Sequence, residues 1–347
     1  MKVLVTGNNG YIGAVMVPML QVKGFEVTGI DTDFYEGCTF GAESISGPIR
    51  KIPYLKKDIR DVRLSDLRGV DAIIHLCALS NDPLGNLNPN LTYQINRDAS
   101  VQLAKLAKKA GVHRFVFSSS CSVYGASTAD IVDEKSATNP VTPYGESKLQ
   151  AEAGISKLAD SKFCPTFMRS ATAYGVSPML RCDLVLNNLT AWAYTNKLVL
   201  LKSDGTPWRP IVHVQDICRA FTSVLEAPKD LVNNEVLNVG KTAENYRIRE
   251  IAEIVKAVVP DSRIEYAKNA EPDKRSYKVD FTKIATTLHN YKPEWDARAG
   301  AKQLYEAYKK VGLLLEEFEG PRYKRVDVLE SLIRSGKLDE TLRRRKT

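Results

Sequence analysis

The chain has 347 residues, of which 44% are hydrophobic and 26% charged, and its formal net charge is +8. This composition is that of an ordinary globular protein and excludes collagen-like, coiled-coil and intrinsically disordered chains. The positive charge does not indicate nucleic-acid binding, because half of it lies in residues 318–347 and the rest is spread without interleaved aromatic residues. A basic surface that attracts small phosphate-bearing metabolites explains the charge with fewer assumptions.

The cysteines and histidines show neither a disulfide pattern nor metal-ligand spacing. No two of the six cysteines are closer than 18 positions, and the four histidines are scattered. We therefore expect no metal, and a protein of the reducing cytoplasm. The uncharged run 3–22 contains glycine, asparagine and proline, so we expect neither a signal peptide nor a membrane span. The expected protein is soluble, with no nucleic-acid or membrane partner.

The first 31 residues have the order strand, glycine-rich turn, helix, strand and acid. Gly7, Gly10 and Gly13 have the spacing of a dinucleotide-binding turn, in which backbone amides approach a pyrophosphate at the start of a helix. Asp31 follows the second strand, where a carboxylate accepts hydrogen bonds from the adenosine ribose hydroxyls and repels a 2′-phosphate. The sequence therefore predicts NAD, rather than NADP, as the cofactor.

Strands and helices continue to alternate along the chain. We predict strands at 71–77, 113–118 and 164–168, with a helix at 96–110 and another that begins near residue 144. This alternation predicts an α/β fold, a Rossmann-type doubly wound, mainly parallel sheet with helices on both faces. Ligands of such sheets bind beyond the carboxyl ends of the strands, so the residues that follow each strand are the ones to inspect.

A tyrosine and a lysine four positions apart follow a serine-rich strand end. Tyr144 and Lys148 share one face of a helix, and Ser120 lies at the end of the strand before them. A nearby ammonium stabilises phenolate, so we expect Lys148 to lower the pKa of Tyr144 into a useful range. The set suits hydride transfer between a carbinol carbon and a nicotinamide; the alternative is an ordinary solvated helix turn.

Taken together, these motifs resemble the extended short-chain dehydrogenase/reductase family, in particular its NAD-dependent epimerase/dehydratase group, which acts on nucleotide sugars. The resemblance runs from Met1 to about residue 285. It implies that Tyr144 is the catalytic acid–base, that Lys148 tunes it and binds the nicotinamide ribose, and that Ser120 is the hydroxyl partner. Cofactor contacts are implied for Gly7, Asn9, Gly10, Tyr11, Ile12, Gly13, Asp31, Asp58, Ile59, Cys77, Ala78, Leu79, Asn96, Ser118, Tyr144 and Lys148.

The resemblance also implies a nucleotide-diphosphate sugar as the substrate. Arginines at the positions of Arg209 and Arg275 grip the substrate diphosphate in related enzymes, and a guanidinium can make bidentate, charge-assisted bonds to phosphate oxygens. Asn81 follows a strand and lies where it could contact the sugar, although a plain turn is the alternative. The expected substrate-binding residues are Asn81, Ser120, Ser122, Arg181, Asn187, Asn188, Arg209 and Arg275.

One departure from the family narrows the expected reaction. Related 4,6-dehydratases carry an acidic pair where this chain has Cys121 and Ser122, and neither residue can supply the acid and base of water elimination. We therefore expect an epimerase that transiently oxidises and re-reduces a sugar carbon, C4 being the first choice. A one-way 4-ketoreductase or dehydrogenase is the alternative, and a non-catalytic NAD-binding regulator is the weakest reading.

The domain organisation is expected to be interleaved. Residues 1–172 form the NAD-binding domain, to which a segment of about 208–238 returns, and residues 173–207 and 239–347 form a smaller substrate lobe with C-terminal helices. The basic end of the chain is expected to be solvated or to lie at a subunit interface. By resemblance, we expect a homodimer.

Overall fold

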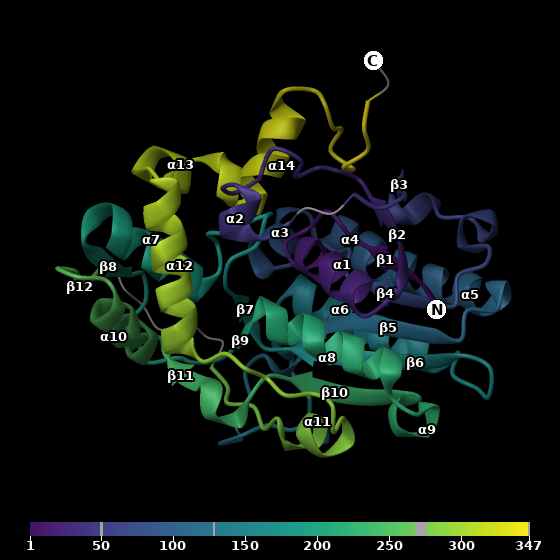
Figure 1. Cartoon of the computed structure of the whole chain (residues 1–347). Helices are drawn as coiled ribbons and strands as arrows, with labels where there is room; N and C mark the ends of the chain where they lie inside the picture. The colour runs from purple at the N-terminus through teal and green to yellow at the C-terminus, as the bar shows by residue number, and fades with distance from the viewer. Residues whose placement is uncertain (49–50, 128, 268–275, 346–347) are drawn as a thin grey trace.

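A seven-stranded parallel sheet forms the centre of the molecule, with strand order β10-β6-β5-β4-β1-β2-β3 (Figure 1). The computed structural model describes residues 1–48, 51–127, 129–267 and 276–345. All four residues of β4 are buried, because a parallel sheet is covered on both faces. The strands are β1 (Lys2–Thr6), β2 (Glu26–Asp31), β3 (Tyr54–Lys56), β4 (Ala72–His75), β5 (Arg114–Ser120), β6 (Cys164–Ser170) and β10 (Glu235–Val239).

The order of the strands reverses between β1 and β4. The chain builds outward from β1 through β2 to β3 and then starts again at β4, on the other side of β1. A doubly wound sheet opens a crevice at the carboxyl ends of the strands where this reversal occurs. The predicted Rossmann-type fold is confirmed, and the reversal fixes where a ligand would enter.

Helices cover both faces of this sheet. Alternate residues of a strand face opposite sides, so Val3 and Val5 pack in the core beneath α1 and α8, whereas Leu4 packs in the core beneath α5 and α6. The connections of this large lobe contain helices α1 (Gly13–Val22), α2 (Glu43–Ser46), α3 (Asp82–Leu87), α4 (Pro89–Thr92), α5 (Ala99–Ala110), α6 (Pro143–Ser156), α8 (Val214–Glu226) and α9 (Lys229–Val232). They also contain a π-helix at Tyr93–Asp98 and short 3-10 turns at Ile59–Asp61, Leu64–Leu67 and Cys121–Tyr124.

A small lobe with its own core stands beyond the carboxyl ends of the large sheet. Its strands form the sheets β11-β9-β7 and β12-β8, and α7, α10 and α12 enclose them (Figure 1). The strands are β7 (Thr172–Tyr174), β8 (Leu198–Leu201), β9 (Trp208–His213), β11 (Asn245–Arg247) and β12 (Arg263–Tyr266). The helices are α7 (Val185–Asn196), α10 (Ile248–Val258), α12 (Ala297–Val311) and α13 (Leu315–Glu319), while α11 (Thr282–Thr287) packs on β10; 3-10 turns lie at Thr242–Glu244 and Pro321–Tyr323.

The end of the chain returns to the large lobe. After α14 (Arg325–Arg334), Leu338 and Leu342 are buried in the same core as α5 and α6. Figure 1 shows α14 near α2 and α3, and the residues after it on the side of the large lobe where β2 and β3 lie. Arg344 and Arg345 are exposed, as expected for a solvated basic end, while Arg343 pairs with Asp58 and Asp61 and Arg344 donates to the Thr32 carbonyl oxygen.

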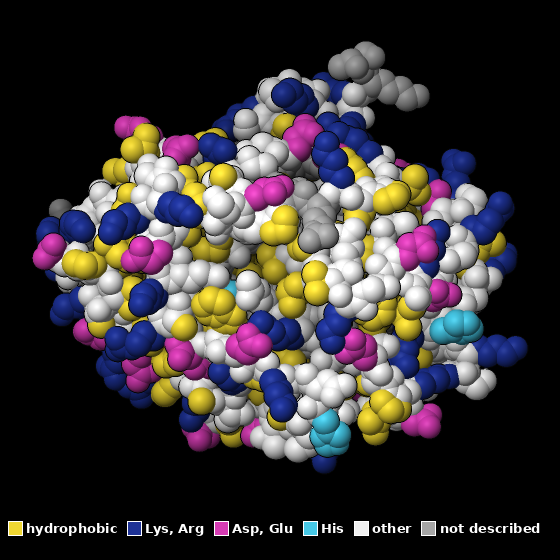
Figure 2. Space-filling model, viewed as in Figure 1, with side chains coloured by type: hydrophobic (Ala, Val, Ile, Leu, Met, Phe, Trp, Pro, Cys, Tyr) yellow, Lys and Arg dark blue, Asp and Glu magenta, His cyan; other side chains and the backbone are white. Residues whose placement is uncertain are grey.

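The surface in Figure 2 carries Lys and Arg side chains interspersed with Asp and Glu. All six cysteines are free thiols, and five of them are buried. Within the described ranges, no group of three or more histidine, cysteine or acidic residues is placed to hold a metal ion. Nor does any helix of those ranges combine the length and the apolar composition that a bilayer crossing requires.

Candidate active site

The glycine-rich turn between β1 and α1 is shaped by a backbone constraint at Gly7 and a steric constraint at Gly13. Gly7 has φ +75°, a conformation that side-chain-bearing residues rarely adopt. A Cβ at Gly13 would lie 2.1 Å from the Gly7 carbonyl oxygen, so only glycine lets α1 start this close to the strand end. The result is a cavity of about 150 Å³ at the start of α1, lined by Gly10, Tyr11 and Ile12 among others.

The end of β2 forms the next part of this cavity. The Asp31 carboxylate accepts hydrogen bonds from the backbone amides of Asn9 (3.0 Å) and Asp33 (2.9 Å), and burial raises its pKa. Asn9 itself points away from the cavity, because its amide donates to the Asp33 carboxylate at 2.7 Å. Asp31 is thus held at the carboxyl end of the strand, where the predicted ribose contact requires it.

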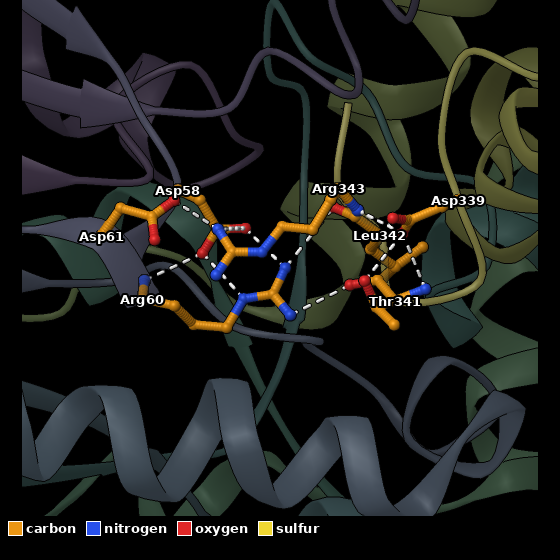
Figure 3. Close-up of polar contacts among 7 residues, drawn as sticks. All are labelled: Asp58, Arg60, Asp61, Asp339, Thr341, Leu342 and Arg343. Carbon is orange, nitrogen blue, oxygen red and sulfur yellow. Dashed lines mark hydrogen bonds and ion pairs between the residues drawn. The ribbon is translucent and has the colours of Figure 1, made fainter. Parts of the chain in front are cut away.

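Asp58 closes the far end of the cavity together with the C-terminal segment. Its carboxylate pairs with Arg60 at 2.7 Å and with Arg343 at 3.4 Å, and Arg343 also pairs with Asp61 (Figure 3). Burial opposes the ionisation of Asp58, but the hydrogen bonds and charge of Arg60 and the charge of Arg343 outweigh it and lower the pKa. Ile59, the next residue, lines the cavity as predicted.

The loop after β4 forms the opposite wall, through Cys77, Ala78 and Leu79. Asn96 fixes this loop: its side chain accepts from the Leu79 amide (2.8 Å) and donates to the Leu79 carbonyl (3.0 Å). It also donates to Ser147 at 3.2 Å and lies in the π-helix, a distortion frequent at functional sites. Asn96 is fully buried and does not line the cavity, so it positions the wall instead of facing a ligand.

Beyond this cavity, a second one of about 560 Å³ contains the predicted catalytic side chains Ser120, Tyr144 and Lys148. Tyr144 lies in the first turn of α6, and its hydroxyl is hydrogen-bonded to Ser120 at the end of β5. Lys148 follows one turn later and donates to the Ser118 carbonyl oxygen at 2.7 Å. The two cavities share the lining residues Tyr11, Ile12, Leu76, Ala78, Ser80 and Arg181, so they form one continuous site.

The pKa of Tyr144 differs from the sequence-based expectation. Burial raises it to about 12, and the Ser120 hydrogen bond only partly opposes this effect. Lys148 was expected to lower it, but the ammonium is directed at Ser118 and burial brings its own pKa down to about 8. The correction has a simple cause: spacing along a helix predicts proximity, whereas desolvation depends on everything packed around the pair.

The substrate side of the larger cavity is held together by an ion pair. Arg181 makes two bonds to Asp183, at 2.9 and 2.8 Å, and a third to Ser80 at 3.1 Å. Asn81 donates to the same carboxylate at 2.7 Å while its side-chain oxygen caps α3. The cavity therefore joins the loop after β4 to the loop after β7, and the predicted substrate residues Ser122 and Arg209 line it.

Two predicted substrate residues, Asn187 and Asn188, do not line this cavity. The Asn187 side chain accepts from Gly175 and donates to the Arg181 carbonyl oxygen, and Asn188 donates to the Cys182 carbonyl oxygen. Both amides thus hold the loop backbone, and their contact with the substrate stays a prediction. Arg275 lies outside the described residues.

Other residues line the site without having been predicted. Ser170, Lys202 and Tyr277 face the larger cavity, and Ser170 Oγ is buried without a hydrogen bond in the described part of the chain. Ser170 is the last residue of β6. Because ligands of such sheets bind beyond the carboxyl ends of the strands, its position could have identified it from the sequence. Arg325 lines the smaller cavity from α14, and no sequence motif marks it.

The fold and this site are those of a nucleotide-binding protein of the α/β class. Residues 3–240 match the NAD dependent epimerase/dehydratase family, and the chain belongs to that family. The predicted family is thereby confirmed, as is its dependence on NAD. The match covers every predicted site residue except Arg275.

Relatives cover most of the chain. It is 29% identical over 316 residues to the UDP-glucose 4-epimerase of Lactobacillus helveticus (85% of this chain, 92% of the relative). It is 23% identical over 320 residues to human dTDP-D-glucose 4,6-dehydratase (89% and 88%). Among solved structures, the UDP-glucuronic acid 4-epimerase of Bacillus cereus in complex with UDP-glucuronic acid and NAD has a TM-score of 0.75 at 25% identity, covering 89% of this chain and 99% of that one.

Proposed function

We propose that the protein is an NAD-dependent nucleotide-sugar 4-epimerase, which inverts a sugar carbon by oxidising and re-reducing it. One observation carries the proposal: the Ser120, Tyr144 and Lys148 side chains line a cavity continuous with the glycine-rich cleft. The epimerases of Lactobacillus helveticus and Bacillus cereus support the reaction class and make UDP sugars the first substrates to test.

The residues of the cleft fit NAD. The approach of α1 to Gly7 leaves a cradle that a Cβ at Gly13 would fill, and the start of a helix favours a phosphate group. The Asp31 carboxylate is fixed at the end of β2, where it would accept hydrogen bonds from ribose hydroxyls and repel a 2′-phosphate. The loop at Ala78 and Leu79 would border the nicotinamide half.

The chain's own residues would manage the proton of the sugar hydroxyl. Bound NAD supplies hydride exchange with the sugar carbon. Tyr144, once ionised to the phenolate, would accept the hydroxyl proton and later return it, and Ser120 would hold the same oxygen by a hydrogen bond. Lys148, buried and bonded to the Ser118 carbonyl oxygen, would hold the nicotinamide ribose.

The surroundings of Ser120 disfavour the dehydratase reaction. Cys121 is 1% exposed and its thiol points to the Arg169 carbonyl oxygen at 3.2 Å, away from the cavity. Ser122 faces the cavity but is neither an acid nor a base near neutral pH. Because elimination of water needs both groups beside the sugar, we propose an epimerase over a dehydratase.

A panel of nucleotide sugars tests the proposal. The purified protein, incubated with UDP-glucose, UDP-glucuronate or dTDP-glucose without added cofactor, is expected to interconvert the C4 epimers of one of them. Stoichiometric consumption of added NADH would instead indicate the one-way reductase, and a 4-keto-6-deoxy product would indicate a dehydratase.

Tyr144→Phe provides the matched catalytic variant for this panel. It is expected to lower kcat by about 10²- to 10⁴-fold, because the proton acceptor is lost. Tyr93→Phe is its control, since the Tyr93 hydroxyl donates a hydrogen bond to Glu146 and does not line the cavity. Full activity of Tyr144→Phe would contradict the assignment. The expected homodimer remains a prediction, which analytical ultracentrifugation would test.

A further inference from the structure

The first residue of α14, Arg325, carries a buried charge whose role the family motifs do not explain. Only 2% of it is exposed, and it lines the smaller cavity with Gly10 and Tyr11. Its Nη2 donates to the Met179 carbonyl oxygen at 2.7 Å, and its guanidinium carbon lies 4.7 Å from the centre of the Tyr35 ring. Its Nη1 is buried and has no hydrogen-bond partner within the described ranges.

Two other buried arginines, Arg169 and Arg181, are each paired with a carboxylate. Arg169 is bonded to Glu152 at 2.7 and 3.0 Å, and Arg181 is bonded to Asp183 at 2.8 and 2.9 Å. Arg325, by contrast, makes no ion pair with a described carboxylate. A guanidinium buried without a counter-charge destabilises the fold unless an anion pairs with it.

Two features of the cavity specify the anion. The cavity begins at the N-terminus of the ten-residue helix α1, whose partial positive charge favours a phosphate group. Arg181 lines the same cavity, and its charge, like burial, lowers the pKa of Arg325. An anion with two phosphate groups is the ligand that both the helix terminus and the guanidinium can contact.

We propose that Arg325 is a cofactor-binding residue whose free Nη1 donates to the diphosphate of NAD. The proposal rests on the cofactor site assigned above. Arg325 would be a cofactor-binding residue outside residues 3–240, the segment that matches the family.

The segment that follows α14 keeps this arginine in place. Arg60 donates to the Thr341 carbonyl oxygen at 3.0 Å, and Arg343 pairs with Asp58 and Asp61 (Figure 3). Leu338 is buried in the core of the large lobe. The end of the chain is thus anchored to the large lobe, and Arg325, at the start of α14, lines the cavity.

Replacement of Arg325 by methionine tests the proposal by binding, independently of activity. Isothermal titration of full-length protein stripped of nucleotide would compare NAD, ADP and adenosine. Arg325→Met is expected to weaken NAD and ADP about 10- to 100-fold, the value of one charge-assisted hydrogen bond with a buried partner, and to leave adenosine unchanged. The Tm of the stripped variant is expected to equal or exceed that of the wild type, because an unpaired buried charge is gone.

Arg334→Met is the matched control, because Arg334 is exposed on the same helix and the substitution removes the same charge. It is expected to leave all three affinities unchanged. Unchanged ADP affinity in Arg325→Met, or equal losses for ADP and adenosine with a lower Tm, would overturn the proposal. Failure of the wild type to bind NAD would instead refute the cofactor site itself.

A second variant and a wild-type measurement keep the test decisive if Arg325→Met does not fold. Arg325→Gln can still donate to Met179 and is expected to show the same selective loss of ADP binding. In the wild type, ADP is expected to raise the Tm more than adenosine does. Equal shifts for the two ligands would overturn the proposal.

Discussion

The cofactor end and the substrate end of the site are built from different parts of the chain and by different kinds of contact. At the cofactor end, Gly7, Gly13 and Asp31 come from one short stretch of chain and act through backbone shape and strand position. At the substrate end, Asn81 and the Arg181–Asp183 pair come from distant loops and act through side-chain bonds. The first end is defined by local steric limits and the second by how the lobes pack. A substitution should therefore act differently at each end.

The largest expected effect is that of Gly13→Ala at the cofactor end. The new Cβ would meet the backbone of Gly7 and Asn8, so the turn must deform. NAD affinity is expected to fall at least about 100-fold and the free energy of unfolding by about 1–3 kcal/mol, the usual cost of overpacking. Titration calorimetry and thermal unfolding measure the two quantities.

Gly37→Ala is the control for that variant, because a Cβ there meets no atom within 4 Å and its backbone needs no positive φ. NAD binding by Gly13→Ala at wild-type affinity would show that backbone shape does not define the cofactor end.

A smaller effect on ligand binding, although a comparable one on stability, is expected from Asp183→Asn at the substrate end. The change leaves the buried Arg181 without its carboxylate, so the free energy of unfolding should fall by about 2–4 kcal/mol. The KM for the nucleotide sugar should rise while NAD affinity changes little. Asp98→Asn, which removes the exposed pair of Arg97 and Asp98, should change stability by less than about 1 kcal/mol. Equal effects of the two variants would contradict a structured ion pair in the cavity.

The smallest expected effect is a pH dependence where the two ends meet. In the folded chain, burial lowers the pKa of Lys148 to about 8, whereas an unfolded lysine titrates near pH 10.4. Between these values the unfolded chain binds more protons, so stability contributed by this group rises with pH, by at most about 1.4 kcal/mol per pH unit. Chemical denaturation of wild type and Lys148→Met at pH 8 and 10 measures it. A pH response that is identical in the two proteins would show that Lys148 is not desolvated.

The same difference between the two ends explains what the sequence could predict. Gly7, Gly13 and Asp31 lie at fixed spacings within one strand–helix–strand segment, Tyr144 and Lys148 lie in one helix, and all five line the two joined cavities. Their spacing could not predict the direction of the Tyr144 pKa shift, because that depends on burial by the whole fold.

Residues from loops and from the end of the chain were harder to assign. Asn187 and Asn188 have the chemistry of substrate ligands, but the loop backbone around Gly175 and Cys182 uses both amides. Arg325 belongs to a helix that returns to the large lobe about 300 residues after the glycine turn, a packing that carries no local pattern. Long-range packing, not side-chain type, decides these assignments.

The central claim, that a sugar carbon is oxidised and then re-reduced at one site, is tested most directly by isotope labelling. A UDP sugar that the protein epimerises would be supplied with deuterium at C4, without added cofactor, and the product examined by mass spectrometry and NMR. The account predicts that the epimer keeps the deuterium at C4, because the hydrogen removed from that carbon returns to it. Replacement of the deuterium by hydrogen from water would contradict the account.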